Sequence, residues 1–332
     1  MKSVFVGGNR LPSVYSEETI AALEREAGLA SREILSKEDV LAGKAKDADY
    51  VFSTWGMPHF TAEEIRAALP NVKAVFYAAG SVQGFAREFL ECGVQVFSAW
   101  GANAVPVVEY AVSQIILANK GFFQSCAKIH DRASRAEAHR YFNGFPGNYG
   151  CSVGVLGAGM IGRAVLQRLK RDYRLHVKVY DPFYSDESAA ADGVEKASLE
   201  DIFATCQTIS NHIANLPATV GMLRYEHFQR MKPNATFINT GRGAQVVEAD
   251  LIRALQEEPG RTAVLDVTMP EPPEDGSPFY MLPNVFLTPH IAGSAGDETF
   301  RMAEFMLEEF RLLSAGKPTR YGVSLAMLAT MA

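Results

Sequence analysis

The stretch of sequence that most limits the fold is CSVGVLGAGMIGRAVLQRL, residues 151–169. A β-rich apolar run comes first, three glycines follow, and a helical pattern of apolar residues comes after them. Gly157 permits a tight turn out of the strand, and Gly162 lets the helix pack closely against that strand. A strand that turns directly into a helix in this way is typical of a parallel sheet covered by helices. The stretch therefore predicts an α/β fold.

The same glycine loop indicates what the sheet binds. Gly159 has no side chain where a pyrophosphate would approach the backbone, and the helix start at Met160 and Ile161 offers free N–H groups to such an anion. The next strand ends on Asp181, about 20 residues after the last glycine, where a dinucleotide-binding sheet carries an acid for the ribose hydroxyls. The three residues after it include no arginine or lysine for a 2′-phosphate. NAD is therefore favoured over NADP, and a methionine-derived cofactor is the competing interpretation of the glycines alone.

The rest of the chain alternates between apolar runs and helical patterns. Its 332 residues suit two domains. Before residue 101, strands are expected within 3–8, 49–56, 72–80 and 94–101, with helices within 16–28, 61–70 and 85–93. Thr61 is the expected N-cap of its helix. A long helix is expected from about Pro106, a Gly-, Asn- and Tyr-rich loop at 140–150 as a boundary, a second βα series over 151–290, and a last helix within 297–316.

Composition excludes several classes of partner. Net charge is −6, hydrophobic residues are 48% and charged residues 21%, as in a soluble globular protein without a basic block for nucleic acid. The four cysteines form no CxxC pair, so we expect no metal and a reducing cytoplasm. We expect no signal peptide at the N-terminus. Polar residues interrupt the apolar segment 104–123, which favours a buried helix over a membrane span.

Three later strands each end on a residue suited to chemistry. Arg242 lies between glycines at the end of one apolar run, and its planar fork matches a carboxylate. Glu271 lies between two prolines after the next run, and His290 ends the last. Each is ambiguous by itself, but neighbouring parallel strands end at one edge of the sheet. An anion clamp, an acid and a titratable imidazole beside a nicotinamide would suffice to interconvert a hydroxyl and a carbonyl.

These residues make the chain resemble the D-isomer-specific 2-hydroxyacid dehydrogenase family. The resemblance runs from about Val51 to Gly296 and includes AAGSVQGF, NAVPVVEYA, GVLGAGMIG, VYDP, RMKPNATFINTGRG, LDVTMPEPP and LPNVFLTPHIAG in the family's order. It implies a Rossmann NAD-binding domain, residues 103–296, inserted into a smaller flavodoxin-like substrate domain, residues 1–102 and 297–332. It also implies doubly wound parallel sheets, a catalytic cleft between the domains and a homodimer formed through the NAD-binding domain.

The resemblance also assigns roles. It implies catalysis by Arg242, which holds the substrate carboxylate and polarises the carbonyl, by His290 as general acid and base, and by Glu271 as its partner. The cofactor contacts that it implies are Gly157, Gly159, Met160, Ile161, Gly162, Asp181, His212, Thr240, Gly241, Asp266 and His290. Among them, Asp266 is expected to hold the nicotinamide carboxamide. The implied substrate contacts are Trp55, Ala79, Gly80, Ser81, Val82, Asn103 and Arg242.

Two departures from the family pattern bear on the substrate rather than on the chemistry. Ala214 stands where many members have a proline, and Val82 and Gln83 stand where members often have an aspartate. The expected activity is the NAD-dependent interconversion of a 2-oxo acid and a D-2-hydroxy acid. Two alternatives stay open: a protein that senses NAD(H) on the same fold, and a dehydrogenase of the formate or phosphite type. A sensor would need only the glycine loop and Asp181.

Overall fold

The computed structural model describes residues 1–329 and divides the chain into two compact units. Unit 1 consists of residues 1–105 together with 294–332, and unit 2 of residues 106–293. Unit 2 is therefore one continuous segment that interrupts unit 1. Unit 2 is therefore three residues shorter at each end than the NAD-binding domain expected from the sequence, residues 103–296. Asn103 and Ser294 belong to unit 1, where Asn103 Oδ1 accepts a hydrogen bond from Ser294 N at 2.9 Å.

Unit 1 is built on a six-stranded sheet with the order β13-β5-β4-β3-β1-β2. The first five strands are parallel in the flavodoxin-like order 2-1-3-4-5, and β13 adds an antiparallel edge. The strands are β1 (Ser3–Val6), β2 (Leu29–Leu35), β3 (Tyr50–Ser53), β4 (Ala74–Tyr77), β5 (Gln95–Ser98) and β13 (Gly322–Val323). The helices are α1 (Glu17–Glu26), α2 (Lys37–Leu41), α3 (Ala62–Ala68), α4 (Ala86–Glu91) and α13 (Phe300–Ser314). The predicted flavodoxin-like sheet is confirmed.

Local signals explain these elements. The Thr61 side chain accepts a hydrogen bond from Glu64 N, and the Glu64 carboxylate accepts one from Thr61 N, so the predicted N-cap is confirmed as a capping box. Strands β3 and β4 are almost wholly buried, as expected for central parallel strands covered on both faces. Stacked and edge-to-face phenylalanines, among them Phe52, Phe76 and Phe310, join this sheet to α13.

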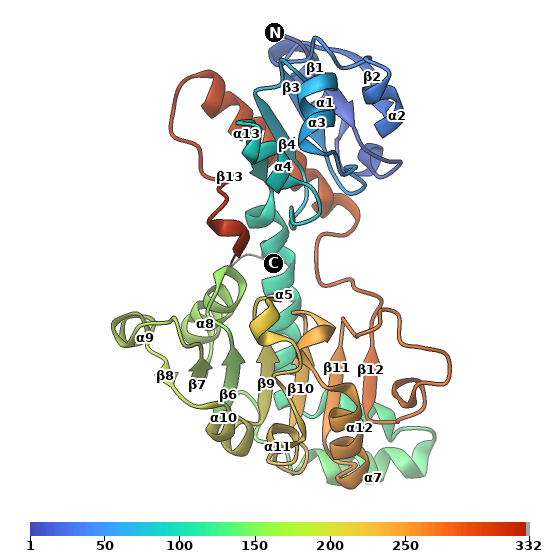
Figure 1. Cartoon of the computed structure of the whole chain (residues 1–332). Helices are drawn as coiled ribbons and strands as arrows, with labels where there is room; N and C mark the ends of the chain where they lie inside the picture. The colour runs from blue at the N-terminus through green and yellow to red at the C-terminus, as the bar shows by residue number, and fades with distance from the viewer. Residues whose placement is uncertain (330–332) are drawn as a thin grey trace. The chain divides into compact units, whose positions relative to one another are not determined.

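Unit 2 is built on a seven-stranded, wholly parallel sheet with the order β12-β11-β10-β9-β6-β7-β8. The strands are β6 (Tyr149–Leu156), β7 (Arg174–Tyr180), β8 (Glu195–Lys196), β9 (Thr208–Asn211), β10 (Thr236–Asn239), β11 (Thr262–Leu265) and β12 (Val285–Leu287). Counted from β6, the order is 3-2-1-4-5-6-7, which is the Rossmann order with one strand added. The predicted Rossmann fold is therefore confirmed. The arrowheads of these strands point to one edge of the sheet (Figure 1).

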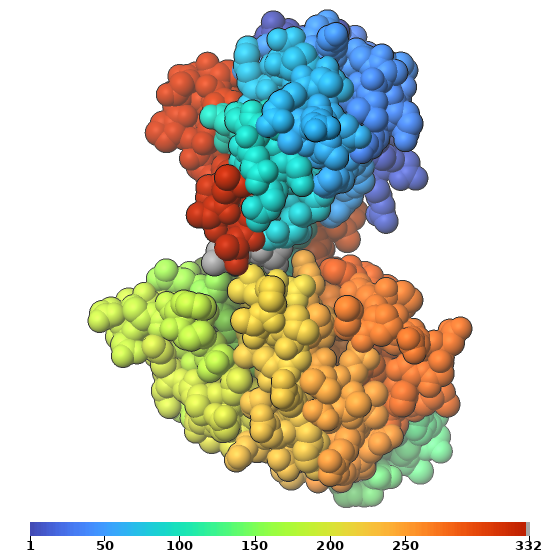
Figure 2. Space-filling view, in the orientation of Figure 1, coloured from blue at the N-terminus to red at the C-terminus, as the bar shows by residue number. Residues whose placement is uncertain are grey.

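The helices of unit 2 cover both faces of that sheet. They are α6 (Phe122–Ala127), α7 (Arg132–Phe142), α8 (Met160–Asp172), α9 (Asp186–Asp192), α10 (Leu199–Thr205), α11 (Tyr225–Phe228) and α12 (Glu248–Glu257). In the space-filling view, the surface of this unit follows the strand order, with the yellow segment between the yellow-green and the orange ones (Figure 2). The switch in strand order at β6 and β9 places the glycine loop after β6 at the point where parallel sheets bind ligands.

Two sequence expectations about the helices were wrong in detail. Helix α5 (Trp100–Asn119) begins six residues before the expected start, with Pro106 inside it. Proline removes only one N–H donor, and the apolar residues around it are packed closely enough for the helix to continue through it. The stretch 140–150 is not a boundary between units, because α7 occupies its first residues and the whole stretch lies in unit 2.

Helix α5 is long and apolar enough to cross a membrane by length and composition alone. Half of its most apolar window is buried inside the protein, and the core helices of soluble proteins meet the same criterion. Ala111, Ile115 and Ala118 are fully buried in the core that also contains Val153 and Val165. The expected role as a core helix accounts for these residues.

Candidate functional site

The glycine loop of unit 2 has the steric properties that a pyrophosphate site needs. A Cβ on Gly162 would lie 1.9 Å from Gly157 O, and one on Gly157 would lie 2.8 Å from His212 O, so both positions need glycine for the protein's own packing. A Cβ on Gly159 would meet nothing within 4 Å among the described residues. Gly159 therefore leaves open space beside the backbone. No residue of the range 1–329 fills this space.

Helix α8 begins beside that space. Gly159 is its N-cap, and within the described residues no side chain caps the helix. The first N–H groups, at Met160 and Ile161, therefore lack the partner that most helix starts provide. Asp181 lies next to the loop, where its Oδ2 accepts from Ala158 N and its Oδ1 from Phe183 N, both at 2.7 Å. These residues fit a dinucleotide, with unpaired donors for phosphate and a carboxylate for ribose hydroxyls.

His212 follows β9, and its backbone lies against the glycine loop at Gly157. Its Nε2 lies 2.9 Å from Ser210 Oγ and its Nδ1 3.4 Å from Thr240 Oγ1. Burial of the ring lowers the pKa of His212 to about 4, so the imidazole is neutral at pH 7. Both ring nitrogens are engaged inside the chain. His212 was expected to contact the cofactor, but these bonds favour a supporting role.

A buried network of amide side chains holds the loop that carries Arg242. Asn211 Nδ2 donates to Asn239 Oδ1 at 3.0 Å and to Gln245 Oε1 at 2.6 Å, and Gln245 Nε2 donates to Ile213 O at 2.5 Å. Asn211, Asn239 and Gln245 are at most 1% exposed. Gly241 N donates to Asn239 Oδ1, and Arg242 N donates to Gln245 Oε1. Asn239 and Gln245 thus each fix a backbone N–H of the loop, and Asn211 holds these two side chains in place.

The Arg242 side chain is half-buried and has no ion-pair partner among the described residues. Its Nη1 donates to Gly241 O at 2.8 Å, which leaves its other N–H groups available to an anion. The next residue, Gly243, lies against the loop after β11, because a Cβ there would be 2.0 Å from the carbonyl carbon of Thr268. The arginine loop and the loop that leads to Glu271 are therefore in direct backbone contact.

Glu271 and His290 form a pair at the same edge of the sheet. Glu271 Oε1 lies 2.7 Å from His290 Nδ1, and the two side chains are 40% and 49% exposed. Because Nδ1 faces the carboxylate, Nε2 is the nitrogen left for a substrate. His290 has a φ of +55°, a left-handed conformation that is uncommon outside glycine.

Asp266, at the end of β11, holds that strained turn. Its Oδ1 accepts from Thr288 Oγ1 at 2.6 Å and from Ile291 N at 2.8 Å, and its Oδ2 accepts from Ala292 N at 2.9 Å. Its backbone oxygen also accepts from His290 N. The carboxylate was expected to hold a carboxamide. The structure gives it a second task, because three of its roughly four acceptor positions position the histidine loop.

The candidate substrate loop lies in unit 1. The N–H groups of Gly80, Ser81 and Val82 have no hydrogen-bond partner within residues 1–329. Ser98 Oγ lies 2.8 Å from Ala79 O and 2.6 Å from Gly80 O, and its one hydroxyl hydrogen can bond to either, which fixes the start of the loop. Consecutive unpaired N–H groups form a concave site for an anion. The loop is therefore suited to a carboxylate through its backbone.

The remaining predicted substrate residues of unit 1 are placed differently. The Val82 side chain is fully buried in the core, so only its backbone can serve a ligand. Trp55 is partly buried and packs against the same core. Asn103 supports the loop region, since its Oδ1 accepts from Ser294 N and its Nδ2 lies 3.6 Å from the position of a Cβ on Gly80. No group of three or more potential metal ligands occurs in the part of the chain that the structure describes.

Comparison with known proteins agrees with this geometry. Residues 115–292, more than half of the chain, match the family model described as D-isomer specific 2-hydroxyacid dehydrogenase, NAD binding domain. The chain belongs to the D-isomer specific 2-hydroxyacid dehydrogenase family. Unit 2 is accordingly an NAD-binding domain, and NAD is the cofactor, as predicted.

Individual relatives support the same assignment. D-3-phosphoglycerate dehydrogenase of Mycobacterium tuberculosis is 32% identical over 257 residues, which cover 76% of this chain and 47% of the relative. The enzyme of that name from Methanocaldococcus jannaschii is 31% identical over 306 residues, 91% of this chain and 56% of the relative. The chain spans about half the length of the curated relatives it matches. The solved structure of D-mandelate dehydrogenase from Rhodotorula graminis has the same fold, with a TM-score of 0.80, 20% identity, and 97% of this chain and 98% of that one covered.

Sequence reasoning missed several supporting residues of this family site. Asn211 and Gln245 were not singled out, nor was Thr288, which bonds to Asp266 and lies 3.0 Å from the hydroxyl of Tyr110 on α5. Glu248 was missed as well. Its Oε1 accepts from Met269 N at 2.7 Å, and burial raises its pKa. A useful signal would have been that uncharged polar residues end the apolar runs of β9 and β10.

Proposed function

We propose that the protein is an NAD-dependent dehydrogenase that interconverts a 2-oxo acid and a D-2-hydroxy acid. The observation that carries this proposal is the pair of Glu271 and His290, 2.7 Å apart, on the loops after two adjacent strands. Arg242, which has no ion-pair partner among the described residues, follows the neighbouring strand β10. Its loop contacts the loop that leads to Glu271. An NAD sensor on this fold would have no use for the three side chains together.

The chemistry follows from the state of each side chain. The glycine loop and Asp181 would hold NADH, which would supply the hydride for reduction of the 2-oxo acid. His290, in its protonated form, donates the Nε2 proton to the carbonyl oxygen and is left neutral, with its Nδ1 hydrogen directed at Glu271. Arg242 stabilises the negative charge that develops on that oxygen. The half-exposed imidazole then regains a proton from solvent, and oxidation of the hydroxy acid reverses these steps.

Two features suit a carboxylate, each within its own unit: the guanidinium of Arg242 in unit 2, and in unit 1 the N–H groups of residues 80–82, which are unpaired within residues 1–329. Backbone N–H groups can bind any carboxylate, so they select for an acid. Recognition of the substituent on the acid depends on other residues. Several relatives are named for D-3-phosphoglycerate. A phosphorylated three-carbon acid therefore belongs among the substrates to be tried.

The test is the loss of NADH fluorescence with a panel of 2-oxo acids that includes glyoxylate, hydroxypyruvate, its 3-phosphate, pyruvate and phenylpyruvate. We expect at least one to be reduced to the D-hydroxy acid. His290→Ala should lower turnover by on the order of a thousandfold, and Arg242→Met by a hundredfold or more. His290→Ala at nearly full activity would remove the acid–base assignment. Tight NADH binding with no reaction across the panel would favour a sensor, and oxidation of formate or phosphite the third alternative.

We also propose a homodimer formed through unit 2. Support comes from a groove of about 410 Å³ beside α6 and α7. Leu117, Phe122 and Ile129 line it and are 37% to 45% exposed, which is unusual for large apolar side chains. Light scattering during gel filtration should give twice the mass of the chain. Phe122→Glu should shift the mass to that of a monomer, and a monomeric wild type would end this proposal.

The compartment is proposed to be the cytoplasm. The four cysteines form no disulfide, and burial raises the pKa of Cys151 to about 11 and that of Cys206 to about 12, so both stay thiols. Cell fractionation tests the assignment. Recovery in the membrane pellet would contradict it.

A further inference from the structure

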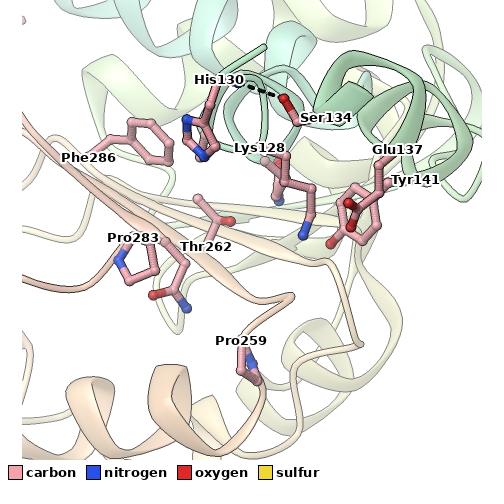
Figure 3. A pocket seen from close by; sticks show the side chains of 12 residues that line it. Lys128, His130, Ser134, Glu137, Tyr141, Pro259, Thr262, Pro283 and Phe286 are labelled. Atoms are coloured by element: carbon pink, nitrogen blue, oxygen red, sulfur yellow. Dashed lines mark hydrogen bonds between the residues drawn. The ribbon is translucent and has the colours of Figure 1, made fainter. Parts of the chain in front are cut away.

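Unit 2 has a second pocket at the other edge of its sheet. The pocket has a volume of about 360 Å³ and is lined by residues of α6 and α7 and by the segments that enter β11 and β12 (Figure 3). Thr262, at its centre, is the first residue of β11, whereas Asp266 follows the last residue of that strand. Because the strands are parallel, this edge lies a full strand length from the cofactor loops. None of the candidate active-site residues line the pocket.

Two buried residues that line the pocket carry an unpaired side-chain oxygen atom. Gln124 is 6% exposed and Thr262 0%. Gln124 Nε2 donates to Thr236 Oγ1 at 3.2 Å and to Asn234 O at 3.4 Å. Because the carbonyl of Asn234 can only accept, these bonds fix the orientation of the amide and leave Oε1 without a donor. Among the described residues, neither Gln124 Oε1 nor Thr262 Oγ1 has a hydrogen-bond partner. A buried polar group left unpaired costs about 1–3 kcal/mol, so a partner from outside the chain is expected.

A third lining residue offers an oxygen of the same kind. Asn284 is 7% exposed, and its Nδ2 donates to Leu255 O at 3.0 Å and to Arg261 O at 2.8 Å. Both amide hydrogens are used, so only the carbonyl oxygen is available to the pocket. Gln124, Thr262 and Asn284, which we call the floor of the pocket, thus carry two amide oxygens and one hydroxyl. A ligand must bring hydrogen-bond donors to this floor.

The rim adds one cation and an apolar wall. Lys128 Nζ lies 4.6 Å from the ring centre of Tyr141, and no carboxylate of the described residues lies within ion-pair distance of it. Figure 3 shows Lys128 and Thr262 in the middle of the pocket, with His130 and Phe286 on one side and Tyr141 and Glu137 on the other. Glu137 is exposed, so solvent weakens its repulsion of an anion.

We propose that this pocket is a second binding site, specific for a small hydroxylated carboxylic acid. The hydroxyl groups donate to Gln124, Thr262 and Asn284, and the carboxylate pairs with Lys128. A hydroxyl is favoured over an ammonium group at the floor, because burying a charge among neutral oxygens costs far more than burying a hydroxyl. The volume suits a small ligand. This site does not depend on the reaction proposed above.

The pocket is also separate from the proposed dimer surface. Residues 124, 128, 134, 137 and 141 line the pocket, whereas residues 122, 126, 135, 138 and 142 line the apolar groove. Along α7 the two sets occupy neighbouring positions, about 100° apart around the helix, so they lie on different faces of it. No residue lines both the pocket and the groove.

The test is ligand-observed NMR on the full chain without cofactor, with L-glycerate, glycerol, propionate and L-serine as probes. L-Glycerate should bind best, because it has both the hydroxyl groups and the carboxylate. Thr262→Val removes one hydroxyl and keeps the shape, and should weaken L-glycerate about tenfold while leaving the fold intact. Lys128→Met should weaken L-glycerate and leave glycerol unchanged. Arg135→Met, on the groove face of α7, is the matched control and should change nothing.

The opposite results would overturn the proposal. If no probe binds, or if the pocket variants bind L-glycerate as well as wild type does, the pocket holds only solvent. If L-serine binds and L-glycerate does not, the ligand class is wrong. Dehydrogenase activity does not enter these measurements, so a failure here is distinct from a failure of the proposed reaction.

Discussion

Two loops of this molecule follow buried parallel strands, are each suited to an anion and are held in opposite ways. The loop of residues 239–245 in unit 2 is fixed by buried amides and by backbone contact at Gly243. The loop of residues 79–84 in unit 1 is fixed at its start by Ser98 and leaves three N–H groups unpaired. A charged clamp must be aimed, because its geometry decides which transition state it stabilises. Backbone N–H groups that bind an anion must instead have no hydrogen-bond partner within the protein.

The first prediction breaks this contrast with a single methyl group in each loop. Gly243→Ala places a Cβ 2.0 Å from the Thr268 carbonyl carbon, so the backbone must shift, and we expect a loss of about 3 kcal/mol in the free energy of unfolding. Gly80→Ala meets its nearest atom at 3.6 Å, an ordinary contact, and should change stability by less than about 0.5 kcal/mol. Urea unfolding of both variants measures this, and equal losses would contradict the contrast.

The second prediction removes the amide network. Gln245→Leu leaves Ile213 O and Arg242 N unpaired in a buried site, and should lower stability by about 2 kcal/mol. It should also lower kcat/KM on the order of a hundredfold, because Arg242 loses its support. Gln256→Leu, at an exposed position of α12, is the control. Full activity of Gln245→Leu, measured by steady-state kinetics, would show that the network does not position the arginine.

The third prediction concerns His212, which supports the glycine loop. Its pKa is lowered from 6.5 to about 4, so the unfolded chain takes up the proton first as pH falls. The contribution to stability is therefore complete above about pH 6.5 and is lost as pH falls towards 4, in total about 3 kcal/mol. Urea unfolding across this range should show a flatter pH dependence for His212→Gln than for wild type, with His176→Gln at an exposed site as control. Parallel curves for wild type and His212→Gln would refute the assignment.

The fourth and smallest effect concerns the loop of unit 1. Gln83 Nε2 donates to Leu328 O at 2.8 Å, which ties the loop to the C-terminal segment. Gln83→Ala should lower stability by less than about 1 kcal/mol and raise KM for the oxo acid about threefold, with kcat unchanged, because the free donors are not touched. Gln95→Ala on β5 is the exposed control. A fall in kcat without a change in KM would mean that the loop takes part in the chemistry itself.

The local sequence was a good guide to elements that depend on neighbours in the chain. The capping box at Thr61, the glycine turn at Gly157 and the acid at Asp181 follow from spacing, because each acts within a few residues or one βα unit. It failed for the start of α5. There, Trp100 packs edge-to-face against Tyr321, a contact with a residue more than two hundred positions later, and such packing can extend a helix beyond the bounds that Pro106 suggested.

By itself, the sequence determined the two parallel α/β folds, the dinucleotide loop and the three strand ends that carry Arg242, Glu271 and His290. Hydrophobic period, glycine placement and capping are properties of short segments, so they can be read in order along the chain. Only the tertiary structure decided that Asn211 and Gln245 aim the arginine loop and that Asp266 holds the histidine turn. It also decided that Gln124 and Thr262 share one pocket. Hydrogen bonds between distant segments depend on strand order and register, and those are fixed only when the whole core packs.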